Sequence, residues 1–386
     1  MKKSIVLLLI LMMTVSLAAC GSPAPAPAEE PAEEPAEEPT ETPAESPAED
    51  GTFELALITD IGTIDDKSFN QGSWEGLRDY AVDNGISHKY YQPSEKSNDA
   101  YLSAIELAVR GGAKVIVTPG FLFEEPIFIA QDQYPDVNFI LIDGVPHSAD
   151  YSEFRTEPNV VGVLYAEDQA GFLAGYSAVK DGNRNLGFMG GMAVPAVVRF
   201  GYGFVQGAEY AAEELGLDPG SITLNYHYTG GFDATPEVQT LAASWFQSGV
   251  EVIFAAGGAV GNSVMAAAEQ AGAKVIGVDI DQSIESETVI SSAMKGLGES
   301  VYSMLEAYYA GTFPGGETMV MEAANDGVAL PMETSRFDSF SQADYDEIFG
   351  KLVNDTDGLA SGMIVDGDVE TAVQIPTNAV VVTLVN

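Results

Sequence analysis

The sequence contains only one cysteine, Cys20, among its 386 residues, so no disulfide can form within the chain. Lys2 and Lys3 precede an apolar stretch over residues 5–17, and Leu-Ala-Ala stands directly before Cys20. This order is typical of a signal peptide, and the cysteine matches a bacterial lipobox, in which it becomes the lipidated N-terminus. The alternative is an ordinary secretory signal with an incidental cysteine.

Long apolar runs are also missing after residue 20, where no stretch reaches the roughly 18 apolar residues that a transmembrane helix needs. Lipidation of Cys20 would therefore anchor the protein to the extracytoplasmic face of a bacterial membrane without spanning it. Residues 21–50 repeat Pro, Ala and Glu and contain no aromatic or branched aliphatic side chain. They have nothing to bury, and we expect a stiff, disordered tether.

Basic residues are scarce: 16 lysines and arginines face 58 acids, for a net charge of −42. The tether contributes ten acids and the signal segment two lysines, so a net charge of −34 remains on residues 51–386. Nucleic-acid binding depends on lysine and arginine contacts to phosphates, so this acidity argues against a nucleic-acid partner. It also disfavours anionic ligands, although a local cation could still hold one.

The motifs of several enzyme classes are absent. The sequence contains no G-x-S-x-G, no H-E-x-x-H and no Walker A loop, and its three histidines are scattered. The glycine-rich turns at residues 187–191 and 257–261 do not match G-x-G-x-x-G either. Adjacent acids such as Asp65 and Asp66 rarely point at one reacting centre. We therefore expect no catalysis, no cofactor and no metal.

Beyond Gly51, short apolar runs alternate with helical stretches, which is typical of β-α units and a parallel sheet. The expected strands are residues 55–59, 114–118, 139–142, 160–164, 186–189, 252–255 and 275–278. Expected helices include residues 100–110, 198–215, 237–247 and 263–271. About 335 residues exceed one ordinary α/β domain, so we expect two lobes. A type I periplasmic-binding-protein fold, with two Rossmann-like lobes and a ligand cleft between them, fits this pattern.

The stretch over residues 54–76 reads as strand, loop and helix, and it places polar residues in the loop. In an open parallel sheet, ligands bind beyond the carboxyl ends of the strands. Asp60, Ser68, Phe69 and Asn70 would lie there, together with Asp65 and Asp66. The alternative is that Ser68 only caps the helix and the two adjacent acids complement its dipole. Phe69 and Asn70 have no such capping role.

Acidic residues also follow two further expected strands. Asp143 follows residues 139–142, and Asp279 follows residues 275–278, with Asp281 two residues later. Carboxylates at such positions can accept hydrogen bonds from sugar hydroxyls or base N–H groups, but they also commonly cap loops. Lys295 follows an apolar stretch. It is either a solvated helix residue or a cation that steadies these acids and a ligand oxygen.

The motif D-x-G-x-x-D-D-K-S-F-N-Q-x-x-W-E-G-L, residues 60–77, resembles the signature of the basic membrane protein family of lipoproteins, the substrate-binding subunits of ABC importers. Further blocks in the same order are V-T-P-G-F (117–121), F-I-L-I-D (139–143), G-F-L-A-G-Y (171–176), G-F-M-G-G (187–191) and I-G-V-D-I-D-Q (276–282). The resemblance implies a receptor that closes two lobes on a nucleoside, expected to be a purine nucleoside, and delivers it to a permease and its ATPase.

The resemblance also implies roles for particular residues. Phe69 would stack on the base, and Phe232 is the best candidate for the second ring, with Phe200 as its competitor. The residues expected to read the base are Asp60, Ser68, Asn70 and Asp143. Those expected to hold the ribose are Gly258, Asp279 and Lys295. The rival ligand is a sugar or another small polar solute, and a rival role is a receptor that presents its ligand to a sensor protein.

The expected domain division is a signal peptide over residues 1–20, a tether over residues 21–50 and a bilobal, monomeric binding domain over residues 51–386. We place residues 53–158 and 290–325 in the first lobe, and residues 159–289 and 326–386 in the second. The segment after Asn325 aligns with no block of the family. It could add a strand to the second lobe, where Pro376 argues for an edge position.

Overall fold

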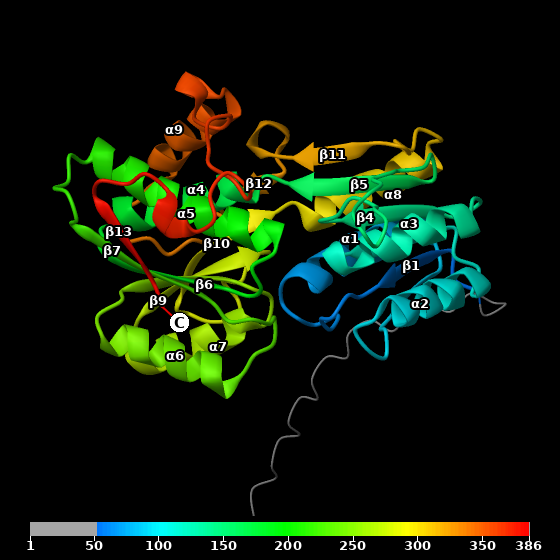
Figure 1. Cartoon of the computed structure of the whole chain (residues 1–386), viewed down its shortest axis with the longest axis horizontal. Helices are drawn as coiled ribbons and strands as arrows, with labels where there is room; N and C mark the ends of the chain where they lie inside the picture. The colour runs from blue at the N-terminus through cyan, green and yellow to red at the C-terminus, as the bar shows by residue number, and fades with distance from the viewer. Residues whose placement is uncertain (1–51, 386) are drawn as a thin grey trace, which may run out of the picture. The chain divides into compact units, whose positions relative to one another are not determined.

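The computed structural model describes residues 52–385, which form two sheets flanked by helices (Figure 1). The first sheet is wholly parallel and has the order β11-β5-β4-β3-β1-β2. Its strands are β1 (Leu55–Ile58), β2 (His88–Tyr91), β3 (Val115–Pro119), β4 (Asn138–Ile142), β5 (Val160–Tyr165) and β11 (Thr318–Met321). The type I periplasmic-binding-protein fold predicted from the sequence is confirmed.

The second sheet has the order β12-β10-β9-β8-β6-β7-β13, and only β12 runs antiparallel to its neighbour. Its strands are β6 (Asn185–Gly190), β7 (Ile222–Tyr228), β8 (Val252–Ala256), β9 (Lys274–Asp279), β10 (Val289–Lys295), β12 (Val328–Ala329) and β13 (Val380–Leu384). β13 pairs with β7 at the edge of the sheet, so the added edge strand expected near the C-terminus is confirmed.

Helices cover both faces of each sheet. Those of the first lobe are α1 (Phe69–Asn84), α2 (Asn98–Arg110), α3 (Glu124–Gln133) and α8 (Leu297–Tyr309). Those of the second are α4 (Glu167–Lys180), α5 (Pro195–Glu214), α6 (Pro236–Gln247), α7 (Val260–Ala271) and α9 (Gln342–Val353). Alternate residues of β1 enter different cores: Leu55 and Leu57 face α1, while Ala56 and Ile58 face α2 and α3.

All seven strands and four helices named from the sequence are present, within a few residues at their ends. The lobe boundaries differ from those expected. β5 belongs to the first sheet and β10 to the second, so the chain crosses between lobes after Tyr165 and after Lys295. A buried apolar strand has the same character in either sheet, so its sequence does not say which sheet it joins. The third crossing lies between β11 and β12, as expected.

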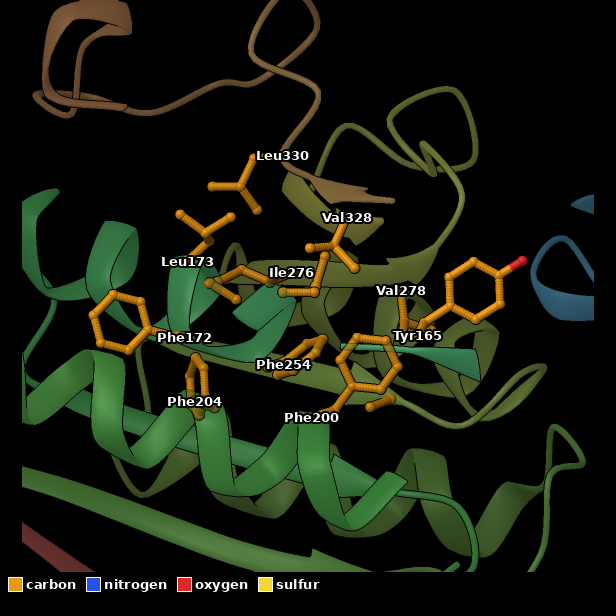
Figure 2. Packing of buried hydrophobic residues seen from close by; sticks show 14 of the residues in the cluster. Tyr165, Phe172, Leu173, Phe200, Phe204, Phe254, Ile276, Val278, Val328 and Leu330 are labelled. Carbon is orange, nitrogen blue, oxygen red and sulfur yellow. The ribbon is translucent and has the colours of Figure 1, made fainter. Parts of the chain in front are cut away.

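The core of the second lobe is built on a close contact between α4 and α5. A Cβ added at Gly171 of α4 would lie 2.1 Å from the carbonyl oxygen of Phe200, and one added at Gly203 of α5 would lie 2.0 Å from that of Asp168. Figure 2 shows the side chains around this contact, where Phe204 lies beside Phe254 of β8, with 5.3 Å between their ring centroids, and Phe172 belongs to the same core. Because glycine has no side chain, the two helix backbones can approach closely, and this contact holds the first turn of α4 in place.

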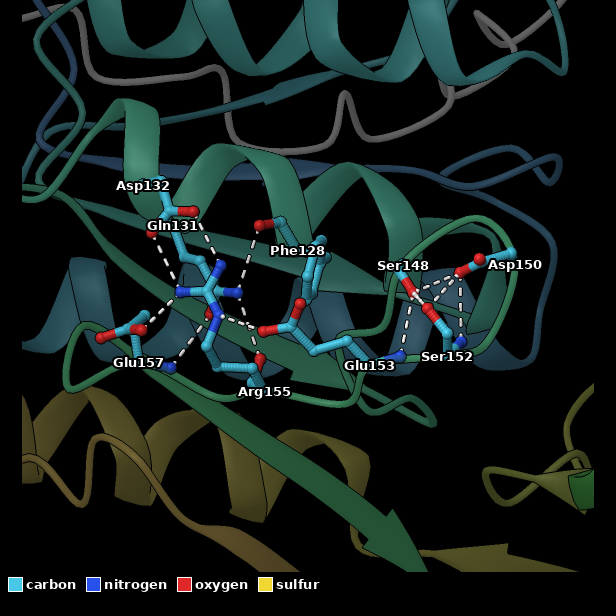
Figure 3. A network of polar contacts seen from close by, with 9 residues as sticks. All are labelled: Phe128, Gln131, Asp132, Ser148, Asp150, Ser152, Glu153, Arg155 and Glu157. Carbon is cyan, nitrogen blue, oxygen red and sulfur yellow. Dashed lines mark hydrogen bonds and ion pairs between the residues drawn. The ribbon is translucent and has the colours of Figure 1, made fainter.

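In the first lobe, Arg155 holds the loop between β4 and β5 (Figure 3). Its guanidinium forms a bidentate pair with Asp132 of α3, at 3.0 and 2.7 Å, and a further ion pair with Glu157. Gln131 donates to the carbonyl of Arg155 at 3.1 Å. Because this loop follows directly after Asp143, the network fixes the backbone on one side of the expected ligand cleft.

Candidate functional site

Four of the predicted residues lie at or just beyond the carboxyl ends of strands: Asp60 after β1, Asp143 after β4, Asp279 at the end of β9 and Lys295 at the end of β10. Asp143 and Asp279 have positive φ angles of 54° and 68°, a left-handed conformation that is uncommon outside glycine. Strained backbone of this kind is common at functional sites. Here it sets the direction of two acidic side chains at the strand ends.

The N-terminus of α1 is organised by Asp66. Its carboxylate accepts hydrogen bonds from the backbone N–H groups of Ser68, Asn70 and Gln71, at 2.9, 2.9 and 3.1 Å. The side-chain amide of Asn70 donates to Asp66 at 2.9 Å and to Asp60 at 3.0 Å. Asp66 therefore caps the helix. Burial raises the pKa of Asp60 to about 6 and also raises that of Asp66.

The alternative role of Ser68 as a cap of α1 is wrong, because its side chain makes no capping hydrogen bond. The Ser68 hydroxyl instead donates to Oδ2 of Asp279, in the second lobe, at 2.5 Å. The neighbouring carbonyl of Lys67 accepts from Gln282 at 2.7 Å, and the Lys67 ammonium pairs with Glu285. Three contacts thus join the start of α1 to the other lobe.

Lys295 occupies the centre of the site and is 3% exposed, so it is not the solvated residue of the alternative interpretation. Its ammonium lies 2.5 Å from Asp143 of the first lobe and 3.0 Å from Glu167 of α4. The rings of Phe69, Tyr165 and Phe200 surround it at 5.2, 5.2 and 5.3 Å from their centroids.

One lysine among several acids sets the electrostatics of the site. Burial alone would lower the pKa of Lys295, but Asp143, Glu167 and Asp279 together raise it. Burial, partly offset by Lys295, raises the pKa of Asp143 to about 7, and burial raises that of Asp279. The lysine therefore stays protonated, and Asp143 titrates near neutrality.

Asp143 carries the feature that points most directly to a ligand. Its Oδ2 binds Lys295, but its Oδ1 is buried and has no hydrogen-bond partner. Among the described residues, only two other buried side-chain atoms share this property, the hydroxyls of Thr59 and Tyr101. A buried carboxylate oxygen without a donor is unfavourable, so this atom can accept a hydrogen bond from a bound molecule.

A chain of alternating charges runs from Lys295 into the second lobe. Glu167 is 1% exposed, and its second oxygen accepts from Arg199 of α5 at 2.9 Å. Arg199 in turn donates to Asp366, in the C-terminal segment, at 2.6 Å. Glu167 is fixed from both sides and cannot turn away from Lys295. Glu167 could have been predicted from the sequence, because it follows a strand as Asp60, Asp143 and Asp279 do.

Phe232 and Gly258 form a second group. Gly258 has a φ of 56° at the turn before α7, and a Cβ added there would approach Phe232 at 3.6 Å. A Cβ at Gly191 would lie 2.5 Å from the Phe232 ring. Within residues 52–385, no hydrogen bond, ion pair or ring contact joins this pair to the other seven predicted residues. Those seven are linked to one another through hydrogen bonds, ion pairs or contact with Lys295.

Comparison with known proteins identifies the family to which the chain belongs. The sequence model for PnrA-like ABC transporter substrate-binding proteins, named Bmp, matches residues 53–355. The chain belongs to this family. It is 30% identical over 315 residues to basic membrane protein D of Borreliella burgdorferi strain JD1, a match that covers 80% of this chain and 86% of the relative.

The substrate-binding protein is also similar to a protein of Lactococcus lactis named "ABC transporter nucleoside-binding protein BmpA", with 29% identity over 77% of this chain and 87% of the relative. Among solved structures, a solute-binding protein of an Aeropyrum pernix ABC transporter system shares 25% identity at a TM-score of 0.64, covering 82% of this chain and 83% of that one. A counterpart from Conexibacter woesei shares 25% identity at a TM-score of 0.63, covering 78% and 97%.

Membership of this family fixes the broad role: a substrate-binding protein takes up a ligand on the extracytoplasmic side and passes it to its ABC transporter. No helix within residues 52–385 is both long and apolar enough to cross a membrane. The signal segment, Cys20 and the tether lie outside the described residues.

Proposed function

We propose that the protein binds a nucleoside, with a purine base preferred, in the cleft between its lobes and delivers it unchanged to its permease. The observation that carries this proposal is the buried, unpartnered Oδ1 of Asp143 beside Lys295. A carboxylate oxygen of this kind suits an N–H or O–H donor, and the adjacent ammonium suits a ligand oxygen. A nucleoside offers both kinds of group on its base and its ribose.

The aromatic residues support a planar ligand. Phe69 is half-buried at the start of α1, so part of its ring remains accessible for a base to stack on. Phe232 is also partly exposed, whereas Phe200 is 2% exposed and packs edge-on against Phe254 at 5.8 Å. The core therefore already uses Phe200, and we retain Phe232 as the second stacking ring. Stacking of one base on an aromatic side chain is worth about 1–3 kcal/mol.

Charge supports a neutral ligand. Residues 51–386 carry a net charge of −34, and Lys295 is already paired with two carboxylates. A phosphate would bring further negative charge against Asp143, Asp279 and Glu167, so a nucleotide should bind much more weakly than its nucleoside. The name of the Lactococcus lactis relative points to the same class of ligand.

The test is calorimetry with purified protein against nucleosides, free bases, ribose and nucleotides. We expect micromolar nucleoside binding, about −8 kcal/mol, that Phe69→Ala and Asp279→Asn each weaken at least tenfold. Phe154→Ala and Glu287→Gln, which alter a 59% exposed ring and a 94% exposed carboxylate, serve as matched controls. Binding of ribose with no response to nucleosides would refute the nucleoside and favour a sugar. Recovery of an altered nucleoside would refute pure binding.

We also propose that Cys20 carries a lipid anchor and that residues 21–50 act as the tether. The support is the sequence pattern alone. Expression of the full chain followed by membrane fractionation tests this: wild-type protein should sediment with membranes, and Cys20→Ser should remain in the soluble fraction. Equal sedimentation of both proteins would contradict the anchor.

A further inference from the structure

The second lobe contains a cavity of about 640 Å³ that involves none of the residues predicted to bind the nucleoside. One wall consists of the end of β7 and the first turns of α5, with Tyr202, Tyr226 and Tyr228. The opposite wall is the C-terminal segment, with Asp366 and Glu370. The family match ends at residue 355, so the segment that completes this cavity lies outside the matched region. A volume of this size is ordinary for a small-molecule site.

The tyrosines give the cavity a spare hydrogen-bond donor and one partly exposed ring, that of Tyr228, whereas Tyr202 and Tyr226 are 3% and 1% exposed. Tyr202 donates to the carbonyl of Val369 at 3.3 Å, which fixes its ring. The hydroxyls of Tyr226 and Tyr228 lie 2.9 Å apart, and one hydrogen bond between them uses only one of their two protons. Burial raises the pKa of Tyr228 to about 12, so its hydroxyl stays neutral.

The cavity is lined by the carboxylates of Asp366 and Glu370 and by the imidazole of His227, whose Nδ1 lies 2.6 Å from the carbonyl oxygen of Val385. Asp366 is bound to Arg199, but the carboxylate of Glu370 has no ion pair or hydrogen bond among the described residues. Neither lysine nor arginine is among the residues that line the cavity. Aromatic faces and carboxylates both attract cations, and the strongly negative domain raises the local concentration of cations further.

We propose that this cavity is a second ligand site, which takes a small organic cation with an ammonium group and an apolar body. The partly exposed ring of Tyr228 contacts the body and the ammonium. Glu370 supplies the opposite charge, because Asp366 is already paired with Arg199. The cavity shares no lining residue with the predicted nucleoside site, although Arg199 connects its Asp366 to Glu167, so the proposal does not rest on the function proposed above.

Benzyltrimethylammonium is a suitable probe, with benzyl alcohol as its neutral counterpart and phenylacetate as its anionic one. Titration followed by calorimetry, or by ligand-observed nuclear magnetic resonance, should show saturable binding of the cation and no saturation by the other two. Glu370→Gln should weaken cation binding about fivefold, Tyr228→Leu about tenfold or more, and the remote control Glu287→Gln less than twofold. Added salt should weaken binding as well.

Several results would overturn the proposal. Equal binding of all three probes would mark an unspecific apolar cavity, and absence of cation binding at 10 mM probe would leave no site. Loss of cation binding in Asp143→Asn, with retention in Glu370→Gln, would place the cation in the nucleoside cleft. Because Glu370 is exposed, its substitution should not disturb folding, so this variant decides the question even if Tyr228→Leu is unstable.

Discussion

Alanine at Gly203 should test how tightly the second lobe is built. A Cβ at this position would lie 2.0 Å from the carbonyl oxygen of Asp168, whereas ordinary van der Waals contact begins at 3.4 Å. The two helices would have to separate by about 1.4 Å. α4 has no room to move, because its residues from Glu167 to Val179 are all buried.

The magnitude follows from two opposing effects. Overpacking of a well-packed interior costs about 1–3 kcal/mol, and a backbone-to-backbone clash belongs near the upper end. Alanine gains about 1 kcal/mol over glycine in helix propensity. We therefore expect Gly203→Ala to lower the free energy of unfolding by about 2 kcal/mol, because the clash outweighs the propensity. Gly350→Ala in α9 is the matched control. It meets nothing within 4 Å and should stabilise the protein by about 0.5–1 kcal/mol.

Urea denaturation followed by circular dichroism measures both variants. With a slope of about 3 kcal/mol/M, the midpoint of Gly203→Ala should fall by about 0.7 M, and that of Gly350→Ala should rise by about 0.2–0.3 M. If the two variants differ by less than 0.5 kcal/mol, the helices separate without penalty and the reasoning about this contact fails.

Three further predictions concern the site. Lys295→Met should abolish nucleoside binding in calorimetry and lower stability by about 3–5 kcal/mol, because it leaves buried carboxylates uncompensated; near-normal stability in urea would contradict this. The raised pKa values of Asp60, about 6, and Asp143, about 7, mean that the folded state binds protons more tightly than the unfolded state. The free energy of unfolding should therefore fall as pH rises from about 4 to 7, and a urea midpoint that is flat or rising over this range would refute it. Nucleoside affinity should rise through pH 7 as Asp143 ionises, and calorimetry of Asp143→Asn should show weaker binding that no longer changes over this range.

The sequence predicted the fold well where the signal was an apolar run of strand length. β2 and β11 were missed because they lie at the edges of the first sheet, where polar residues are admitted, as in the sequence HKYY of β2. β7 lies between β6 and β13 and was missed because polar residues alternate with its buried ones. Two parts of the site were predictable, namely the acids at the strand ends and the loop before α1, because parallel strands bring their carboxyl ends to one edge of the sheet. Arg199 was not, because its role depends on a contact with Glu167 across the glycine-lined interface of α4 and α5, and no local pattern encodes that proximity.

The contacts of Ser68 with Asp279 and of Lys67 with Gln282 join the two lobes through protein groups alone. They stabilise this arrangement of the lobes over any in which the lobes lie apart, and so they influence the fraction of molecules that adopt it before a ligand binds. Apparent affinity scales with that fraction, and a change of about 1.4 kcal/mol in these contacts shifts it up to tenfold. Substitution of Gln282, which need not touch the ligand, could thus adjust capture and release without altering which molecule is recognised.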